Sequence, residues 1–161
     1  VQPGDIGTLA AQDADNVAIT GGSVQDVTFT GSFAGITSIT SASFKATEDL
    51  GYTIGAGGTV TQATDKSTGV TLNKPSGQIT MNAAQLSRNS GVTFTLTNSF
   101  IAATDVVLVN IASGATPSTY TATVDAVAAG SCAIHLHNHT TGTDPAEAVV
   151  LNFVVIKGAV T

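Results

Sequence analysis

Three histidines alternate with other residues in the segment 134–139, which reads Ile-His-Leu-His-Asn-His. If this segment is a β-strand, His135, His137 and His139 point to one face, because successive side chains alternate between the two faces of a sheet. Neighbouring imidazoles on one face can bind zinc, iron, nickel or copper. These histidines are therefore the strongest candidates for chemistry that the sequence offers.

Three interpretations of these histidines are open. They can contact solvent or a ligand, they can form a metal site with His135 and His137 as ligands, or they can form a buried structural pair. No carboxylate partner is evident, and the Thr-Thr-Gly that follows indicates that His139 already lies in a turn. We therefore expect histidines that contact solvent or a ligand, and neither a metal nor any other cofactor.

The sequence contains no motif for enzymatic catalysis. There is no Gly-x-Ser-x-Gly elbow, and Cys132 lies on the same predicted strand as His135, which does not give the geometry of a Cys–His nucleophile. Acidic residues occur singly except for Glu48 and Asp49, so the two carboxylates of a glycosidase would have to come from different chains. The Gly-rich segment 55–58 lacks the Lys-Ser/Thr of a phosphate-binding loop, and it favours a hairpin. We predict that the protein is not an enzyme.

The composition favours an all-β fold. The 161 residues are 42% hydrophobic and only 10% charged, with 17 Gly and no Trp, and Thr, Ser, Ala and Val are abundant. Small and β-branched side chains suit pleated sheets better than helices. A chain of this length supports one compact domain with a small appendage. The single Cys132 excludes an intrachain disulfide, and we expect it to be a small buried side chain.

The charge pattern disfavours two classes of partner. The formal net charge is −6, and the five basic residues are scattered singly, whereas nucleic-acid binding needs clustered positive charge. No apolar run approaches the ~20 residues of a membrane span, so we expect no membrane insertion. The low charge density fits a surface that neighbouring chains partly cover, or one that Thr and Asn keep soluble.

The segment 16–44 has large apolar residues mostly two or three positions apart, with Gly, Ser and Thr between them. This spacing predicts short strands and tight turns. Apolar side chains this sparse do not offset the entropy lost on ordering the segment, so it must pack on a domain or on copies of itself. The residues expected at an interface between copies are Val17, Ile19, Val27, Phe29, Phe33, Ile36, Ile39 and Phe44.

The remainder of the chain reads as a second unit, with a predicted boundary between 1–46 and 47–161. Its predicted strands have the spacing of a sandwich or barrel. They are 58–63, 69–72, 77–81, 92–98, 106–113, 120–128, 131–138 and 149–157. The segment 82–91 has modest helical character or is a loop. Because 106–109 and 149–156 are continuously apolar, we expect burial on both faces, with another subunit or domain covering the outer face.

Several stretches resemble bacteriophage fibre proteins. Residues 4–24, GDIGTLAAQDADNVAITGGSV, resemble a segment common in tail-fibre and head-fibre proteins. The later stretches GGTVTQATDKSTGVTLNKPSGQITMN, VTFTLTNSFIAATDVVLVNIASG and EAVVLNFVVIKGA resemble a terminal domain of phage virion proteins of the same kind. The resemblance covers most of the chain.

This resemblance implies a homotrimeric virion protein, assembled in the cytoplasm of the bacterial host. Its residues 1–46 would form an extended or prism-like trimeric β stem, with the apolar residues of 16–44 at the trimer interface. Its residues 47–161 would form an antiparallel, jelly-roll-like β-sandwich head. The implied partners are further copies of the chain, other virion proteins, and a glycan or protein of the host surface.

Two roles follow from the resemblance. In the first, the chain is the distal part of a tail fibre, and its head attaches to the host cell. The residues expected to contact the receptor are Tyr120, His137, Asn138, His139, Thr141 and Asp144, at positions expected in loops, where recognition usually takes place. In the second, the chain is a head fibre or capsid decoration with a purely structural role. A soluble glycan-binding module of bacterial origin is a third reading.

Overall fold

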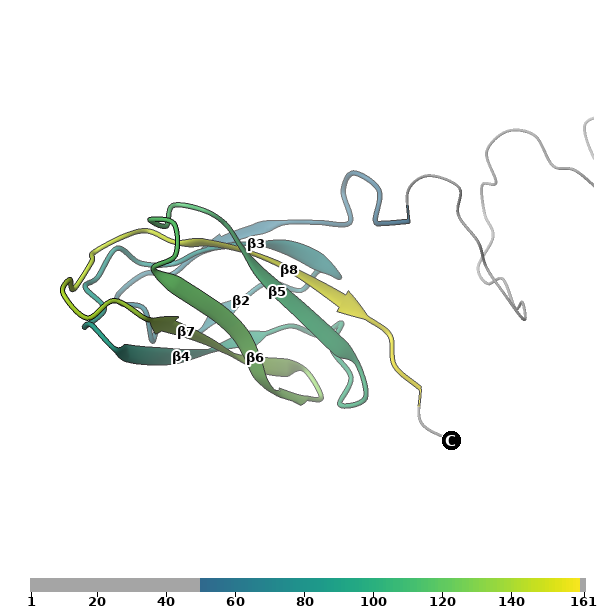
Figure 1. Cartoon of the computed structure of the whole chain (residues 1–161). Helices are drawn as coiled ribbons and strands as arrows, with labels where there is room; N and C mark the ends of the chain where they lie inside the picture. Colours follow the sequence, from purple (N-terminus) through teal and green to yellow (C-terminus); the bar gives the residue numbers. More distant parts are fainter. Residues whose placement is uncertain (1–49, 160–161) are drawn as a thin grey trace, which may run out of the picture. The chain divides into compact units, whose positions relative to one another are not determined.

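The computed structural model describes residues 50–159, and all regular structure among them is β (Figure 1). The strands are β1 (Thr59–Thr61), β2 (Val70–Thr71), β3 (Ser76–Thr80), β4 (Ser90–Thr97), β5 (Val106–Ser113), β6 (Tyr120–Ala128), β7 (Ser131–Asn138) and β8 (Val150–Ile156). The stem predicted for 1–46, its eight interface residues and the boundary at residue 46 lie outside the described residues. No helix long and apolar enough to cross a membrane occurs between residues 50 and 159.

The eight strands predicted for this part of the chain are confirmed, and three of them have the predicted bounds. The segment 82–91 contains no helix and forms a loop that ends in β4. Its backbone amides bond outside the pattern of a helix: Ala84 N donates to Asn82 Oδ1 at 2.8 Å, and Leu86 N donates to Pro145 O at 3.1 Å. These partners replace the bonds that a helix would have made within the segment.

The strands form two four-stranded sheets, in the orders β1-β3-β8-β5 and β2-β4-β7-β6. Both sheets are mixed, because β1 pairs with β3 and β2 pairs with β4 in parallel, while the other neighbours are antiparallel. The predicted antiparallel pairing is therefore found in four of the six strand pairs, and the pairs β1–β3 and β2–β4 depart from it. In each parallel pair the chain crosses to the other sheet and returns between the two strands, so two reversals restore the original direction.

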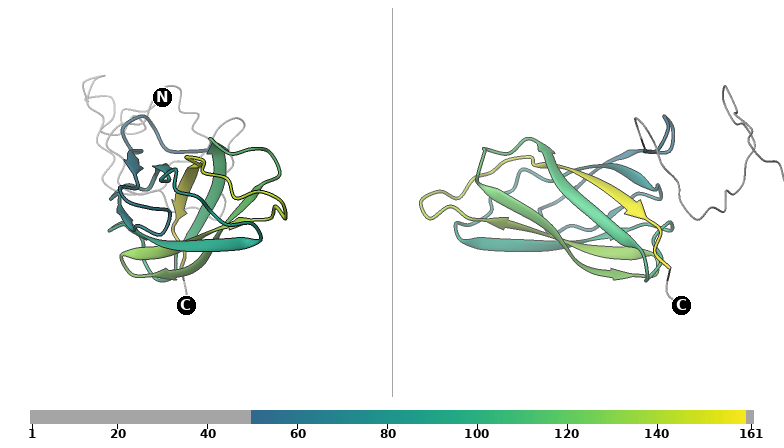
Figure 2. Two further views of the ribbon diagram at one scale, coloured as in Figure 1. Left: turned by 90° about the vertical axis from the view of Figure 1, so that its left-hand side faces the viewer. Right: turned by 45° about the vertical axis from the view of Figure 1, so that its right-hand side comes forward.

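One hydrophobic core takes side chains from both sheets, which Figure 2 shows as two layers. Its fully buried members include Ile79 and Leu151 from one sheet and Leu96, Ile134 and Leu136 from the other. Cys132 also lies in this core, 2% exposed, as predicted, and burial raises the pKa of its thiol to about 11.

The outward positions of β5 and β8 differ from the prediction of burial on both faces. Val107 is buried, but its neighbours Val106 and Leu108 are each 51% exposed, and Ile156 at the end of β8 is 49% exposed. The prediction assigned the covering of this outer face to another subunit or domain, and within one chain the face is half exposed. The inward side chains alone fill the core, and the apolar sequence pattern continues on the outer face of the sheet, where it is only partly covered.

Candidate functional site

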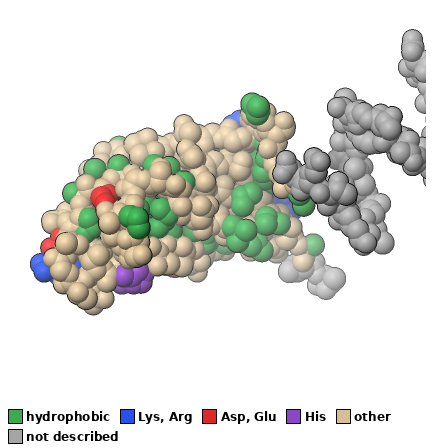
Figure 3. Space-filling model, turned by 45° about the horizontal axis from the view of Figure 1, so that its top comes forward, with side chains coloured by type: hydrophobic (Ala, Val, Ile, Leu, Met, Phe, Trp, Pro, Cys, Tyr) green, Lys and Arg blue, Asp and Glu red, His purple; other side chains and the backbone are tan. Residues whose placement is uncertain are grey.

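The histidines lie on the outer face of the β2-β4-β7-β6 sheet. Burial alternates along β7, where Ile134 and Leu136 enter the core while His135 and His137 point outward and are partly exposed. His139 follows the last residue of β7 and is exposed. Figure 3 shows the histidines as one group on the surface. The prediction that the three side chains share one face is confirmed, as is the position of His139 beyond the strand.

The three imidazoles form a continuous row. The ring centroids of His135 and His137 are 6.1 Å apart, and the ring planes differ by 26°. Those of His137 and His139 are 4.5 Å apart, with planes that differ by 54°. We call these three residues the histidine row.

Threonine hydroxyls from both neighbouring strands bond to the histidine row. Thr93 Oγ1 on β4 lies 2.8 Å from His135 Nδ1, and Thr121 Oγ1 on β6 lies 2.7 Å from His139 Nε2. Neither threonine was predicted to contact the histidines, because the cross-strand neighbours of a residue depend on strand register. The alternating threonines of β4 and β6 were the available signal.

A carboxylate also reaches the row, contrary to the expectation that none was nearby. Asp125 Oδ2 lies 3.8 Å from His135 Nδ1, and its Oδ1 accepts a bond from Thr123 Oγ1 at 3.1 Å. The strand register shifts between Val124 and Ala126, and Asp125 occupies that irregularity. A β-bulge redirects a side chain in a way that regular alternation does not predict.

Gly91 provides the space for the first ring of the row. It pairs with His137 across the β4–β7 ladder. A Cβ at Gly91 would lie 2.3 Å from His135 Nε2 and 3.2 Å from His137 Nδ1. Any larger residue at this position must therefore displace the His135 imidazole.

The row offers groups for hydrogen bonding and stacking. Imidazole nitrogens and hydroxyls both donate and accept hydrogen bonds, and the faces of imidazole rings can stack on a flat ligand. Among residues 50–159 no three His, Cys, Asp or Glu side chains are grouped so that they could hold a metal ion.

Two residues predicted to contact a receptor, Tyr120 and Asn138, are buried, so the prediction is wrong for both. Asn138 is fully buried: its Nδ2 donates to Leu86 O at 3.0 Å and to Ser87 O at 3.2 Å, and its Oδ1 accepts from Thr140 N at 2.9 Å. Tyr120 pairs with Asn138 across the β6–β7 ladder and is only 9% exposed. Both residues have the inward parity of their strands, opposite to that of the histidine row.

The hydroxyl of Tyr120 lies in a buried polar cluster. Tyr120 Oη and Glu147 Oε2 are both buried without a hydrogen-bond partner in the described part of the chain. Burial, together with the Glu147 carboxylate, raises the pKa of Tyr120 well above its usual value. The Thr116 hydroxyl donates to Glu147 Oε1 at 2.5 Å, and the Thr116 amide donates to the same oxygen at 3.1 Å. These bonds lower the pKa of Glu147.

The same cluster includes a buried lysine. Lys66 is 3% exposed, and its Nζ donates to Asn82 O at 2.7 Å and to Glu147 O at 2.5 Å. Burial lowers the pKa of Lys66, and the nearby Glu147 charge partly opposes that shift. The cluster joins the four loops after β1, β3, β5 and β7 to the start of β6, which is a structural role.

The remaining predicted receptor residues lie at or near the surface. Thr141 is exposed in the loop after β7, and Asp144 is partly buried in the same loop. Asp144 Oδ1 accepts from Arg88 N at 2.6 Å, and its Oδ2 lies 3.3 Å from Arg88 Nη2. Thr141 is therefore free to contact a ligand, whereas Asp144 already fixes the loop before β4.

A second surface feature lies on the opposite sheet. Val106 on β5 lies directly opposite Ile156 on β8, and Leu108 lies opposite Val154. We call these four outward side chains, together with Tyr52 beside them, the apolar strip.

Comparisons with known proteins identify no relative: no protein-family model matches the sequence, and no match is found among curated proteins or solved structures.

Proposed function

We propose that this chain is a structural virion protein of a bacteriophage, a homotrimeric fibre whose terminal β unit attaches to the surface of the host cell. The observation that carries this proposal is the histidine row, in which three imidazoles lie exposed or partly exposed on one face between threonine hydroxyls. The resemblance of the sequence to phage fibre proteins gives the row its biological setting.

The row is suited to a glycan of the host surface. Sugar hydroxyls both donate and accept hydrogen bonds, and so do the imidazoles and threonine hydroxyls of this face. Among the described residues the row has one ion-pair partner, Asp125, whose Oδ2 lies 3.8 Å from His135 Nδ1, beyond hydrogen-bond distance. The receptor-contacting set is therefore revised to His135, His137, His139, Thr93 and Thr121, with Thr141 at the edge.

The same proposal includes the arrangement of a β-sandwich head and a trimeric stem. We take the two mixed sheets to form a jelly-roll-like sandwich head, preceded by a trimeric stem in residues 1–46. The single core with side chains from both sheets supports this assignment of the head. The sparse apolar residues of 16–44 support the stem, since one copy of that segment cannot close a core.

A second candidate role is favoured by the apolar strip. In a capsid decoration or head fibre, a weakly charged β unit packs permanently on other virion proteins. An outer sheet face with half-exposed Val106, Leu108 and Ile156 suits permanent packing better than transient recognition.

The two roles are separated by a binding experiment on cells. Labelled full-length protein is incubated with a panel of bacterial cells and with their extracted surface polysaccharides. We expect saturable binding to some strains, about tenfold weaker for His137→Ala, and competition by the protein with adsorption of phages to those strains. Thr95→Ala is the matched control, because Thr95 is exposed on the same sheet opposite Ala133, away from the row. Binding to none of the cells would refute attachment and favour the structural role.

A further inference from the structure

The outer face of the β1-β3-β8-β5 sheet carries no charge. None of its four strands contains Asp, Glu, Lys, Arg or His. At one end the face consists of the apolar strip, and at the other it becomes polar, where Gln78 Nε2 donates to Asn152 Oδ1 at 2.9 Å. The strip is thus a bounded apolar area on an otherwise amide- and hydroxyl-bearing face.

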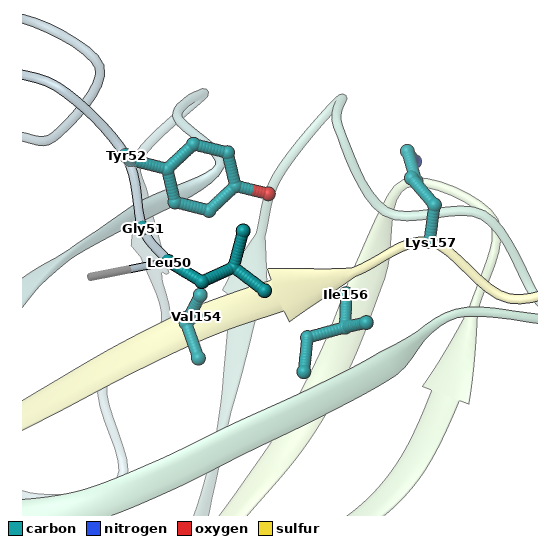
Figure 4. A pocket seen from close by; sticks show the side chains of 6 residues that line it. All are labelled: Leu50, Gly51, Tyr52, Val154, Ile156 and Lys157. Atoms are coloured by element: carbon teal, nitrogen blue, oxygen red, sulfur yellow. The ribbon is translucent and has the colours of Figure 1, made fainter. Parts of the chain in front are cut away.

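A groove of about 520 Å³ overlaps one side of this strip (Figure 4). Leu50, Gly51 and Tyr52 form one side, and Val154 and Ile156 of β8 form the other, with Lys157 at the end. Tyr52 Oη donates to Val155 O at 2.8 Å, which fixes the ring against the sheet. The groove is therefore preformed, although Leu50 is 80% exposed and Tyr52 49% exposed.

The charge at the rim of the groove is already paired. Lys157 Nζ lies 2.6 Å from Asp105 Oδ2 and also bonds to Phe100 O. The Asp105 carboxylate is buried and accepts a further bond from Ala102 N at 2.8 Å. An apolar partner can therefore cover the groove without leaving this cation unpaired.

We propose that the groove and the apolar strip together are a self-association surface, which binds the same region of a second copy of this chain. The proposal concerns the β unit itself and does not depend on the protein being part of a virion. It adds an interface separate from the one predicted for residues 16–44.

The charge distribution favours this face over the rest of the surface as the place where two copies meet. Copies that each carry a formal charge of −6 repel one another, and the repulsion is smallest where two uncharged faces meet. β5 is also an edge strand of its sheet, and its outward residues Val106 and Leu108 are half exposed. Edge strands that lack charges or prolines readily pair with other chains.

The point of attachment of the preceding segment agrees with this occupant. Leu50 lines the groove, and residue 49 is bonded to it in every copy. Copies that meet at the groove therefore bring the attachment points of their N-terminal segments together. A core shared between copies, which the sequence predicts for 16–44, requires such proximity.

Thiol chemistry on the full chain tests the proposal. Leu108→Cys places a thiol in the strip, and Thr95→Cys places a matched thiol on the exposed face of the opposite sheet. The native Cys132 is buried, so the unmodified chain serves as the blank. We expect a bis-maleimide to link two chains through residue 108 and not through residue 95. We also expect maleimide to label position 108 at least tenfold more slowly than position 95, with the difference shrinking on dilution.

Each other outcome overturns the proposal. Equal labelling rates without cross-links mean that the strip faces solvent. A protected thiol in a chain that light scattering shows to be a monomer means that a segment of the same chain covers the groove. A protected thiol in an oligomer without cross-links means that a different surface joins the copies. If Leu108→Cys does not fold, Val154→Cys, directly opposite on β8, replaces it with the same expected results.

Discussion

The outer face of the β2-β4-β7-β6 sheet presents imidazoles and hydroxyls, whereas that of the β1-β3-β8-β5 sheet presents Val106, Leu108 and Ile156 at one end and amides at the other. Inward, the two sheets are alike, since both supply aliphatic and aromatic side chains to one core. The two sheets therefore differ in their outward-facing residues, which occupy every second position along each strand. One outer face therefore offers polar groups for contact, and the other offers an apolar area at one end.

The largest effect is expected beneath the histidine row. Asn138→Ala removes a buried amide and leaves the carbonyls of Leu86 and Ser87 without their donor. We expect the free energy of unfolding to fall by about 3 kcal/mol, measured by urea denaturation of the full chain. His137→Ala, one residue earlier but facing outward, should change it by about 0.5 kcal/mol or less. Equal losses of unfolding free energy would contradict the assignment of inward side chains of β7 to stability and of outward ones to recognition.

The next effect breaks the apolar face. Leu108→Glu would bury an unpaired carboxylate between copies, and we expect association to weaken about 100-fold, as measured by sedimentation over a dilution series. If other contacts keep the copies together, faster maleimide labelling of a Val154→Cys thiol reports the opened surface. Asn110→Glu is the control, because Asn110 has the same parity on β5 but lies in the polar part of the face. An unchanged association constant for Leu108→Glu would contradict the proposal that copies meet at the apolar end of this face.

A smaller effect sharpens the polar face. Gly91→Ala introduces a Cβ into the space of the His135 ring, so the row must rearrange. We expect a changed NMR signal for the His135 ring and roughly tenfold weaker binding to cells, with association unaffected. Gly142→Ala is the control, because a Cβ there meets no atom within 4 Å. An unshifted ring signal in Gly91→Ala would show that the row tolerates a side chain at this position.

The smallest effect concerns pH at the rim of the groove. The bond from Ala102 N, followed by the bond from Lys157, holds the pKa of Asp105 below its usual value. A lowered carboxylate pKa stabilises the folded state above the pKa of the unfolded chain, and this contribution is lost as pH falls through the folded pKa. We expect the thermal midpoint to decline below about pH 4, and to decline less in Asp105→Asn. Parallel pH profiles for the two proteins would contradict this assignment.

The strands were predictable because their alternation depends only on neighbouring residues. Thr93-Phe94-Thr95-Leu96 shows this pattern, and so does the histidine segment. The site was predictable only in part. Gly91, Thr93 and Asp125 reach the histidines through strand register and a bulge, which local sequence does not encode.

Two errors have a common cause. Tyr120 and Asn138 were assigned to loops that contact a receptor, but they lie at the ends of β6 and β7, where their parity directs them inward. In β5 and β8 the apolar run hides the parity, so the sequence did not distinguish Leu108 on the outer face from Val107 in the core. The chemical type of a strand residue alone does not show whether its side chain enters the core or lies on the outer face.

The position of β8 has a consequence for biosynthesis. It is the last strand of the described residues, yet in its sheet it lies between β3 and β5. While the ribosome still holds residues 150–156, β3 and β5 lack their shared neighbour, and this sheet cannot close. Folding of the unit is therefore expected to follow the release of this segment, and a polypeptide that stops before β8 should be removed by cellular proteases.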